Sequence, residues 1–319
     1  MPRPRALFVK LSSLGDVVHH FPAVTDLAAH RPDIEIAWAV EEAYADLVRL
    51  HPAVREVIPM ALRAVKSRPL GFAAWRRLQA SRRLLGAGRW DYVVDTQGLV
   101  KSAWVARKAP GIRFGPDRAS ARERAAAKSY DVGIAVPREL HAVERNRRLV
   151  ASVFGYSVAS AAQYGLDPAL APPSFAPSER YVVLLHAASR EAKRWPAEHW
   201  IELGSLLAQR GFACVLPGGS AMEREAATRI AARIPGAMSL PAAGLADMAA
   251  LLANAWLVAG VDTGLTHLAV ALGRPTIGIY CATRPELTGL HGGRSINLGG
   301  PGAAPSVADV VGILGPGAA

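Results

Sequence analysis

Short apolar runs alternate with helical patterns along the whole chain. Runs of strand length in the first half occupy residues 6–11, 34–40 and 92–94, and helical periodicity occupies residues 17–30, 73–85 and 102–109. Runs as apolar as these are typical of strands that are buried on both faces of a sheet. Because they alternate with helices, they predict an α/β domain with a parallel sheet.

The same alternation restarts in the second half. Strands are predicted at residues 181–185, 212–216, 257–261 and 276–280, and helices at residues 197–209, 221–232 and 265–271. Four prolines fall within residues 163–177, which indicates a linker. We therefore expect two doubly wound, Rossmann-like domains, residues 1–162 and 178–319, that face each other across a cleft.

Length and composition agree with this organisation. A chain of 319 residues is long enough for two cores, and 51% hydrophobic with 20% charged residues is typical of a folded protein. Cys214 and Cys281 give neither a disulfide framework nor zinc-ligand spacing, which favours a reducing compartment. Lys10 interrupts the first apolar run, and no run approaches the ~18 residues of a membrane span. We expect a cytoplasmic enzyme.

Positive charge is concentrated in the first half. The net charge of +11 comes entirely from residues 1–160, and residues 60–130 alone carry +12. This imbalance indicates a polyanionic partner, such as an anionic membrane surface, a phosphorylated substrate or nucleic acid, unless it is only a solvated basic face. Nucleic acid is the weakest option, because the segment has no recognised binding motif and too few aromatic residues for base stacking.

Polar motifs follow several of the predicted strands. Ser12 to Asp16 follow the first strand, and Asp16 could be a general base at a cleft or simply a helix cap. Between residues 186 and 196, Arg190 and Lys193 precede a helix that Pro196 opens, which indicates a diphosphate site rather than two solvated cations.

The sharpest motif spans residues 261–267. Gly264 permits a close backbone approach, the amides and the Thr263 hydroxyl could bind phosphate, and Asp262 could accept sugar hydroxyls. A helix cap could coexist with these roles, and His267 suits packing better than catalysis. Glu223, after a Gly-Gly turn, could bind a ribose or remain a solvated residue at a helix start.

Several common motifs are absent from the sequence. There is no Walker A sequence, GxGxxG, HExxH, GxSxG or CxxC, and no DxD pair that would indicate a metal holding a nucleotide diphosphate. These absences favour a metal-free nucleotide-sugar enzyme over a hydrolase or a kinase.

Five segments together resemble one family. They are residues 9–17, 94–102, 141–145, 186–196 and 261–267. They resemble the heptosyltransferases of lipopolysaccharide inner-core assembly, glycosyltransferase family 9, which have the metal-independent GT-B fold. The resemblance extends over nearly the whole chain.

The resemblance implies transfer of L-glycero-D-manno-heptose from ADP-heptose to a Kdo residue of Kdo-lipid A, with inversion and without a metal or other cofactor. It also implies a monomer in Gram-negative bacteria, peripheral on the cytoplasmic face of the inner membrane. Asp16 matches the base and Lys193 the cation on the ADP phosphates. The other implied donor-binding residues are Ser189, Glu223, Asp262, Thr263, Gly264 and His267. The implied acceptor-binding residues are Ser12, Gly15, Arg63, Lys66, Arg68, Gln97, Arg122 and Arg145.

Two positions depart from the family pattern. Ala188 replaces a frequent Thr of the phosphate loop, and Ala243 replaces a frequent Met beside adenine. The residues around Asp16 and Gln97 look like the enzymes that add the first heptose. Enzymes that add the second heptose are the nearest alternative, followed by a GT-B nucleotide-sugar epimerase and a non-catalytic binder of anionic lipid.

Overall fold

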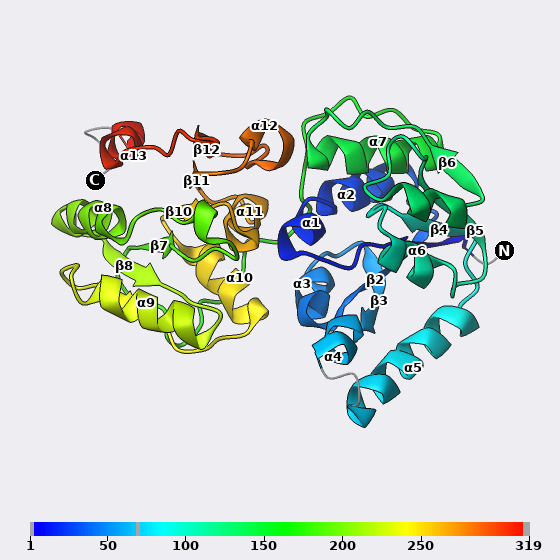
Figure 1. Ribbon diagram of the computed structural model, residues 1–319, viewed down its shortest axis with the longest axis horizontal. Coiled ribbons are helices and arrows are strands. Elements are labelled where there is room, and N and C mark those ends of the chain that lie inside the picture. Colours follow the sequence, from blue (N-terminus) through cyan, green and yellow to red (C-terminus); the bar gives the residue numbers. More distant parts are fainter. Residues whose placement is uncertain (1–2, 68–70, 315–319) are drawn as a thin grey trace. The chain divides into compact units, whose positions relative to one another are not determined.

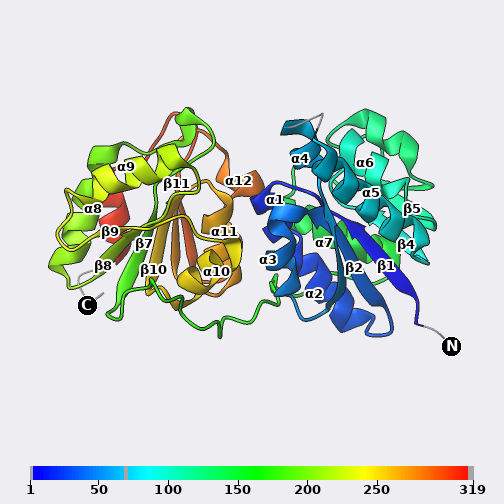
Figure 2. The same cartoon turned by 90° about the horizontal axis from the view of Figure 1, so that it is seen from below.

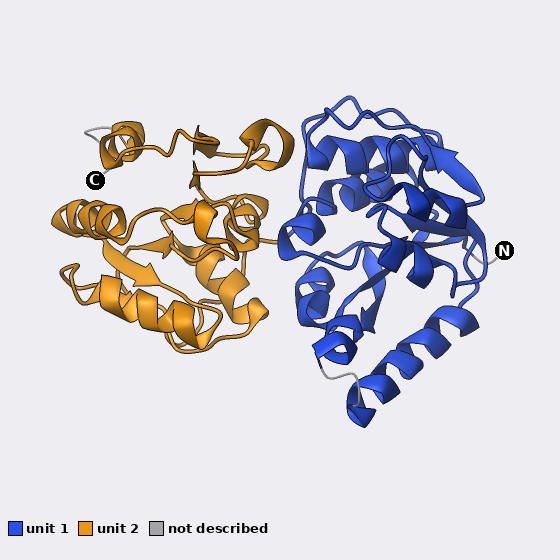
Figure 3. Ribbon diagram, viewed as in Figure 1, with its two compact units in different colours: residues 1–166 blue, residues 167–319 orange. Residues whose placement is uncertain are grey.

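The structure, a computed structural model, describes residues 3–67 and 71–314. The chain divides into two compact units, Met1–Leu166 (unit 1) and Asp167–Ala319 (unit 2), shown in two colours in Figure 3. The division falls inside residues 163–177, the proline-rich segment expected to be a linker. Each unit is a parallel sheet with flanking helices, as the alternating pattern predicts.

The sheet of unit 1 has six parallel strands in the order β3-β2-β1-β4-β5-β6. Their bounds are β1 Arg5–Val9, β2 Glu35–Glu41, β3 Val54–Met60, β4 Tyr92–Asp95, β5 Ile112–Pro116 and β6 Val132–Ile134. Leu7 of β1 pairs with Ala37 of β2 on one side and Val93 of β4 on the other. This order is the doubly wound order, and its switch point lies between β1 and β4.

Helices cover both faces of this sheet (Figure 1). Their bounds are α1 Leu14–Val18, α2 Phe21–His30, α3 Ala45–Arg49, α4 Leu62–Ser67, α5 Phe72–Ala87, α6 Val100–Ala106 and α7 Ala142–Phe154. α5 and α6 bury Leu78, Leu85 and Val105 in a cluster with the strands, and α2 packs on α7. The single helix predicted for residues 17–30 is wrong: two helices form, and Pro22, which cannot donate an N–H, stands in the first turn of the second.

Unit 2 repeats the same topology with the order β12-β11-β10-β7-β8-β9. Its strands are β7 Tyr181–Leu185, β8 Ala213–Leu216, β9 Met238–Ser239, β10 Leu257–Val261, β11 Thr276–Tyr280 and β12 Ser295–Gly299. Its helices are α8 Ala197–Gln209, α9 Ala221–Ala231, α10 Leu245–Asn254, α11 Gly264–Ala271, α12 Pro285–Thr288 and α13 Val307–Leu314. The switch point lies between β7 and β10.

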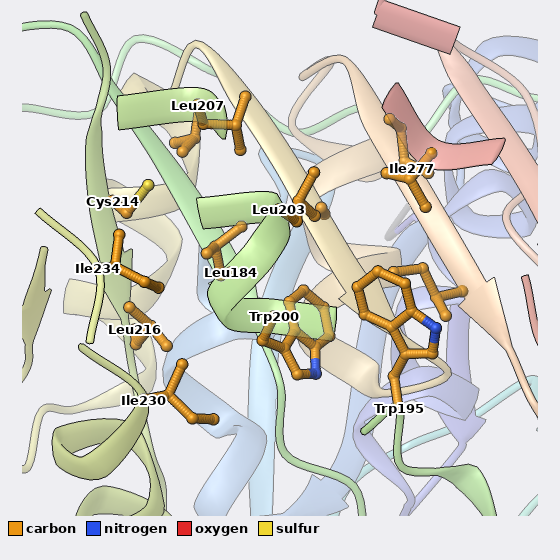
Figure 4. Packing of buried hydrophobic residues seen from close by; sticks show 14 of the residues in the cluster. Leu184, Trp195, Trp200, Leu203, Leu207, Cys214, Leu216, Ile230, Ile234 and Ile277 are labelled. Carbon is orange, nitrogen blue, oxygen red and sulfur yellow. The ribbon is translucent and has the colours of Figure 1, made fainter. Parts of the chain in front are cut away.

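The core of unit 2 is an apolar cluster between the sheet and α8, α9 and α13 (Figure 4). Trp200 of α8 is fully buried, and its ring meets that of Trp195 edge to face with centroids 5.0 Å apart. The Trp195 indole donates to the Pro305 carbonyl, which fixes the segment that leads into α13. Among the described residues, no helix is long and apolar enough to span a bilayer.

A buried ion pair joins α2 to α7 in unit 1. Arg147 donates to Asp26 at 2.7 Å, and the two side chains are 2% and 8% exposed. Arg147 also donates to Glu144 at 2.9 Å. We expect Arg147→Met to lower the free energy of unfolding by about 3–5 kcal/mol, because it leaves a buried carboxylate without its cation. Urea unfolding would measure this loss, and Asp26→Leu combined with Arg147→Met should recover most of it; equal stability of single and double variants would contradict this account.

Candidate active site

Parallel doubly wound sheets bind ligands where strands on either side of the switch point end. In unit 1 these ends carry the residues after β1 and β4. In unit 2 they carry the residues after β7 and β10. Four of the five segments that resemble the family lie at these strand ends. Residues 9–17 and 94–102 are therefore neighbours in unit 1, and residues 186–196 and 261–267 are neighbours in unit 2.

Asp16 lies in the first turn of α1, directly after β1. Its Oδ2 accepts the backbone N–H of Ser13 at 2.9 Å, which is the helix-cap arrangement. Its Oδ1 accepts from the Arg122 guanidinium at 3.1 Å, and the Asp16 side chain is 26% exposed. The carboxylate therefore does cap the helix, and it remains accessible beside a cation.

Gln97 holds the loop after β1 in place. Its Oε1 accepts the Leu11 N–H at 2.8 Å, and its Nε2 donates to the Ser12 carbonyl at 2.6 Å. Lys101 of α6 donates to the Ser12 hydroxyl at 2.8 Å. Gln97 is 2% exposed, so the structure gives it a positioning role for the loop that carries Asp16.

In the sequence, Lys10 interrupts the first apolar run and belongs to the motif over residues 9–17, but no role is assigned to it there. In the structure its ammonium is buried and donates to the Thr96 carbonyl at 2.8 Å and to Asn146 Oδ1 at 3.1 Å. Burial, partly opposed by the nearby Asp16 carboxylate, lowers the pKa of Lys10 to about 8. No sequence signal beyond its place at the end of a strand could have marked this residue.

These groups line one pocket of about 50 Å³ in unit 1. Lys10, Asp16, Arg122 and Arg145 all face it, together with Gln97. Burial lowers the pKa of Arg145, and the neighbouring Arg122 lowers it further. Three cations surround one carboxylate, an arrangement that suits the binding of an anion beside a candidate base, Asp16; His19 also lines this pocket.

The other predicted acceptor residues that the structure describes do not line this pocket. Gly15 is inside α1. Arg63 and Lys66 are on α4, after β3, where the Arg63 guanidinium donates to the Tyr44 hydroxyl at 2.6 Å. Arg68 falls outside the described residues. The structure does not place Arg63 or Lys66 among the residues that line the pocket.

In unit 2, Asp262 is the centre of a polar cluster after β10. Its Oδ2 accepts from Lys193 at 2.6 Å and from the Thr283 hydroxyl at 2.8 Å, and its Oδ1 lies 3.5 Å from His267 Nε2. Burial would raise the pKa of Asp262, but the hydrogen bonds from His267, Lys193 and Thr283 outweigh burial and hold it well below its usual range. Asp262 therefore stays ionised and fixes the Lys193 ammonium.

The other predicted donor residues surround this cluster. Ser189 is exposed on the loop after β7, just before the 3-10 turn Glu191–Lys193. Thr263 is the N-cap residue of α11, although its hydroxyl makes no cap hydrogen bond, and Gly264 is the first residue of that helix. An extended N-cap followed by glycine leaves backbone N–H groups of α11 accessible to an anion.

Glu223 is already bonded to its own helix start. Its Oε2 accepts the N–H groups of Gly219 at 3.0 Å and Ser220 at 2.8 Å, which completes a capping box on α9. The structure therefore shows the helix-start role that the sequence left open. A side chain at Gly218 would meet the backbone of Glu223 and Arg224, so glycine is needed for this close turn.

Sequence reasoning missed Lys10, Lys101 and Thr283. Thr283 follows β11, the strand next to β10, so the adjacency of these strand ends was the available signal. Within residues 3–67 and 71–314, no group of three or more His, Cys, Asp and Glu side chains is arranged to hold a metal ion.

Comparisons with known proteins identify the family to which this chain is similar. A family model described as glycosyltransferase family 9 (heptosyltransferase) matches residues 78–308. The chain is 43% identical to lipopolysaccharide heptosyltransferase 1 of Pseudomonas aeruginosa, covering 92% of this chain and 83% of that protein, and 41% identical to that of Escherichia coli K12, covering 90% and 91%. The solved structure of E. coli heptosyltransferase WaaC with ADP superposes with a TM-score of 0.90 at 38% identity, covering 97% of this chain and 98% of that one.

The two doubly wound units and their strand-end sites define a glycosyltransferase of the GT-B fold. This class and its fold were both expected from the sequence. The chain belongs to glycosyltransferase family 9, the heptosyltransferases.

Proposed function

We propose that this enzyme transfers L-glycero-D-manno-heptose from ADP-heptose to a Kdo residue of Kdo-lipid A, in assembly of the lipopolysaccharide inner core. One observation carries the proposal. The chain superposes on E. coli heptosyltransferase WaaC with ADP-2-deoxy-2-fluoro heptose at a TM-score of 0.87 and 38% identity, covering 97% of this chain. In sequence, the heptosyltransferase 2 relatives align with only 30% of the chain, whereas the heptosyltransferase 1 relatives align with about 90% at 40–43% identity, which favours addition of the first heptose.

In the proposed reaction the acceptor hydroxyl attacks the anomeric carbon in a single displacement. The new carbon–oxygen bond forms on the face opposite the bond to phosphate, which breaks, so the configuration inverts. Asp16 takes the proton of the attacking hydroxyl, and ADP leaves with the electron pair of the broken bond. Lys193, fixed by Asp262, neutralises charge that develops on the diphosphate, so we propose that no metal ion is required.

Unit 2 would bind the donor. The accessible N–H groups at the start of α11, with Thr263 and Gly264, suit a phosphate, and Ser189 lies on the loop that carries Lys193. Asp262 would position Lys193 and would also contact the donor sugar. We propose that the Glu223 oxygen not used in the capping box accepts from the ribose, and that His267 orients Asp262.

Unit 1 would bind the anionic acceptor. Lys10, Arg122 and Arg145 in the pocket suit a carboxylate or phosphate beside Asp16, while Ser12, Gly15 and Gln97 shape the loop. Arg63 and Lys66 extend the positive surface along α4, and Arg68 follows them in sequence. We further propose that the enzyme works as a monomer at the cytoplasmic face of the inner membrane, where a lipid acceptor would be presented.

The test is release of ADP from ADP-heptose with Kdo-lipid A in the presence of EDTA. We expect release that depends on the acceptor and is unchanged by EDTA. An acceptor that already carries one heptose should be a poor substrate; if it is the better one, the enzyme adds the second heptose. Turnover of the donor without any acceptor would replace the proposal with an epimerase or hydrolase activity.

The pKa of Lys10 predicts how acceptor binding depends on pH. Because that pKa is lowered to about 8, the ammonium loses its proton as the pH rises through 8, and an anionic acceptor loses one charge-assisted contact. We expect the KM for the acceptor to rise about tenfold between pH 7 and pH 9.5, with a smaller change in the KM for ADP-heptose. Lys10→Arg, which stays charged, should remove this rise; a rise that persists in Lys10→Arg would assign it to another group.

A further inference from the structure

One face of unit 1 combines exposed aromatic rings with unpaired positive charge. α5 buries only a narrow stripe, Ala74, Leu78, Ser81 and Leu85. On its outward side Phe72 is 75% exposed and Trp75 is 42% exposed. Phe72 and Trp75 lie three residues apart on one face of the helix, and large exposed apolar side chains that gather in one patch indicate an interaction surface.

Three of the four arginines of α5 lie on the same side as these rings. With 3.6 residues per turn, Phe72, Trp75, Arg76, Arg82 and Arg83 fall within an arc of about 120°. α5 contains no acidic residue. Within the described part of the chain, no carboxylate lies within ion-pair distance of Arg76, Arg82 or Arg83, whereas Arg77, on the other side of the helix, pairs with Glu42 at 3.3 Å.

The neighbouring helix α6 extends this face. The Arg82 guanidinium lies over the ring of Trp104, 5.4 Å from its centroid, and the Lys108 ammonium lies over the same ring at 5.6 Å. Trp104 is 38% exposed. Figure 2 shows α5 and α6 on the same side of the unit 1 sheet. We call this set, Phe72, Trp75, Arg76, Arg82, Arg83, Trp104 and Lys108, the aromatic-basic face.

We propose that the aromatic-basic face docks on a bilayer of anionic phospholipid. Aromatic rings and arginines together suit the boundary between headgroups and acyl chains, where the rings enter and the guanidinium groups remain with the phosphates. Each basic side chain near an anionic leaflet strengthens binding by about fivefold. The charge is complementary to a phospholipid surface, and the protruding rings suit a soft apolar layer better than a rigid polyanion.

The docking surface depends on the proposed function only because an enzyme with a lipid acceptor has to reach a membrane. It is distinct from the acceptor pocket, since none of its residues lines that pocket. The test therefore uses vesicles that contain no acceptor: phosphatidylglycerol with phosphatidylethanolamine, and phosphatidylcholine alone. The full chain is sedimented with each, and the partition coefficient is measured at low and at 0.5 M salt.

Trp75→Ser with Arg76→Gln is the test variant. Arg77→Gln with Leu84→Ser is its matched control, because Leu84 is 51% exposed on the opposite side of the same helix. We expect the test variant to lower binding to anionic vesicles at least tenfold and the control to lower it less than twofold, with weak binding to phosphatidylcholine throughout. Turnover of a deacylated, water-soluble acceptor should be the same in both variants.

Equal losses in the two variants, or equal binding of the wild type to neutral and anionic vesicles, would overturn the docking surface while leaving the proposed function intact. Failure of transfer to the soluble acceptor in the wild type would instead contradict the proposed function. A test variant that loses turnover but keeps vesicle binding would place these residues at the acceptor and not at the bilayer.

Discussion

Asp16→Asn is expected to lower kcat for heptose transfer by about a hundredfold or more. The amide keeps an oxygen that can accept the Ser13 N–H, so the start of α1 remains capped, but it cannot take a proton from the acceptor. Removal of a general base typically costs about 10²–10⁴ in rate. Steady-state release of ADP at saturating donor and acceptor measures the loss.

Asp46→Asn is the matched control for this variant. Asp46 is also an aspartate in the first turn of a short helix of unit 1, α3, and it pairs with an arginine, Arg49, at the surface. We expect Asp46→Asn to keep kcat within twofold and both variants to keep the wild-type urea midpoint. A fully active Asp16→Asn would reduce Asp16 to its capping role, and a large fall in its urea midpoint would assign the lost activity to misfolding.

The strands at the centre of each sheet were predictable because every residue in them avoids water. Residues 181–185, 257–261 and 276–280 coincide with strands that are buried throughout. The outer strands were not predicted, because their patterns are mixed. β12 is largely exposed, and β3 includes Arg55 and Glu56. A hydrophobic pattern indicates which residues are buried. It therefore identifies the central strands of a doubly wound sheet but not the strands at its edges.

α7 shows the same limit for helices. Arg147 and Asn146 fall on its buried face, where Arg147 pairs with Asp26 and Asn146 accepts from Lys10. Apolar residues do recur at helical spacing in α7, at Val143, Val150 and Phe154, but the two polar residues on the buried face interrupt that pattern. The compensating partners are Asp26 of α2 and Lys10, directly after β1, both more than 120 residues away in the sequence, so no local signal points to them.

The sequence motifs were enough to predict candidate site residues, but they did not show which of these residues contact one another. Asp16, Lys193 and Asp262 were each singled out because they follow predicted strands and because they match motifs of the family. The sequence did not show that Lys193 and Asp262, 69 residues apart, form one ion pair, or that Thr283 joins them. Such contacts depend on which strands are neighbours, and strand order follows from the fold as a whole.

The second large effect that we expect concerns the ion pair between Lys193 and Asp262. Lys193→Met is expected to lower kcat/KM for ADP-heptose by about 10²–10³, as for other groups that stabilise developing charge in a transition state. Asp262→Asn should lower it by a smaller factor, about tenfold or more, because it releases the Lys193 ammonium from its fixed place without removing its charge. Both effects are measured from initial rates at low donor concentration.

The double variant distinguishes positioning from independent action. If Asp262 acts through Lys193, Asp262→Asn should cost little more once Lys193 is Met, so the free energies of the two single changes will not add. Additive losses would mean that Asp262 contacts the donor sugar on its own. Arg229→Met, which breaks the exposed pair between Arg229 and Glu225 of α9, is the matched control and should leave kcat/KM unchanged. The cycle thus separates the sugar contact that the sequence assigned to Asp262 from the support for the Lys193 ammonium that the structure shows.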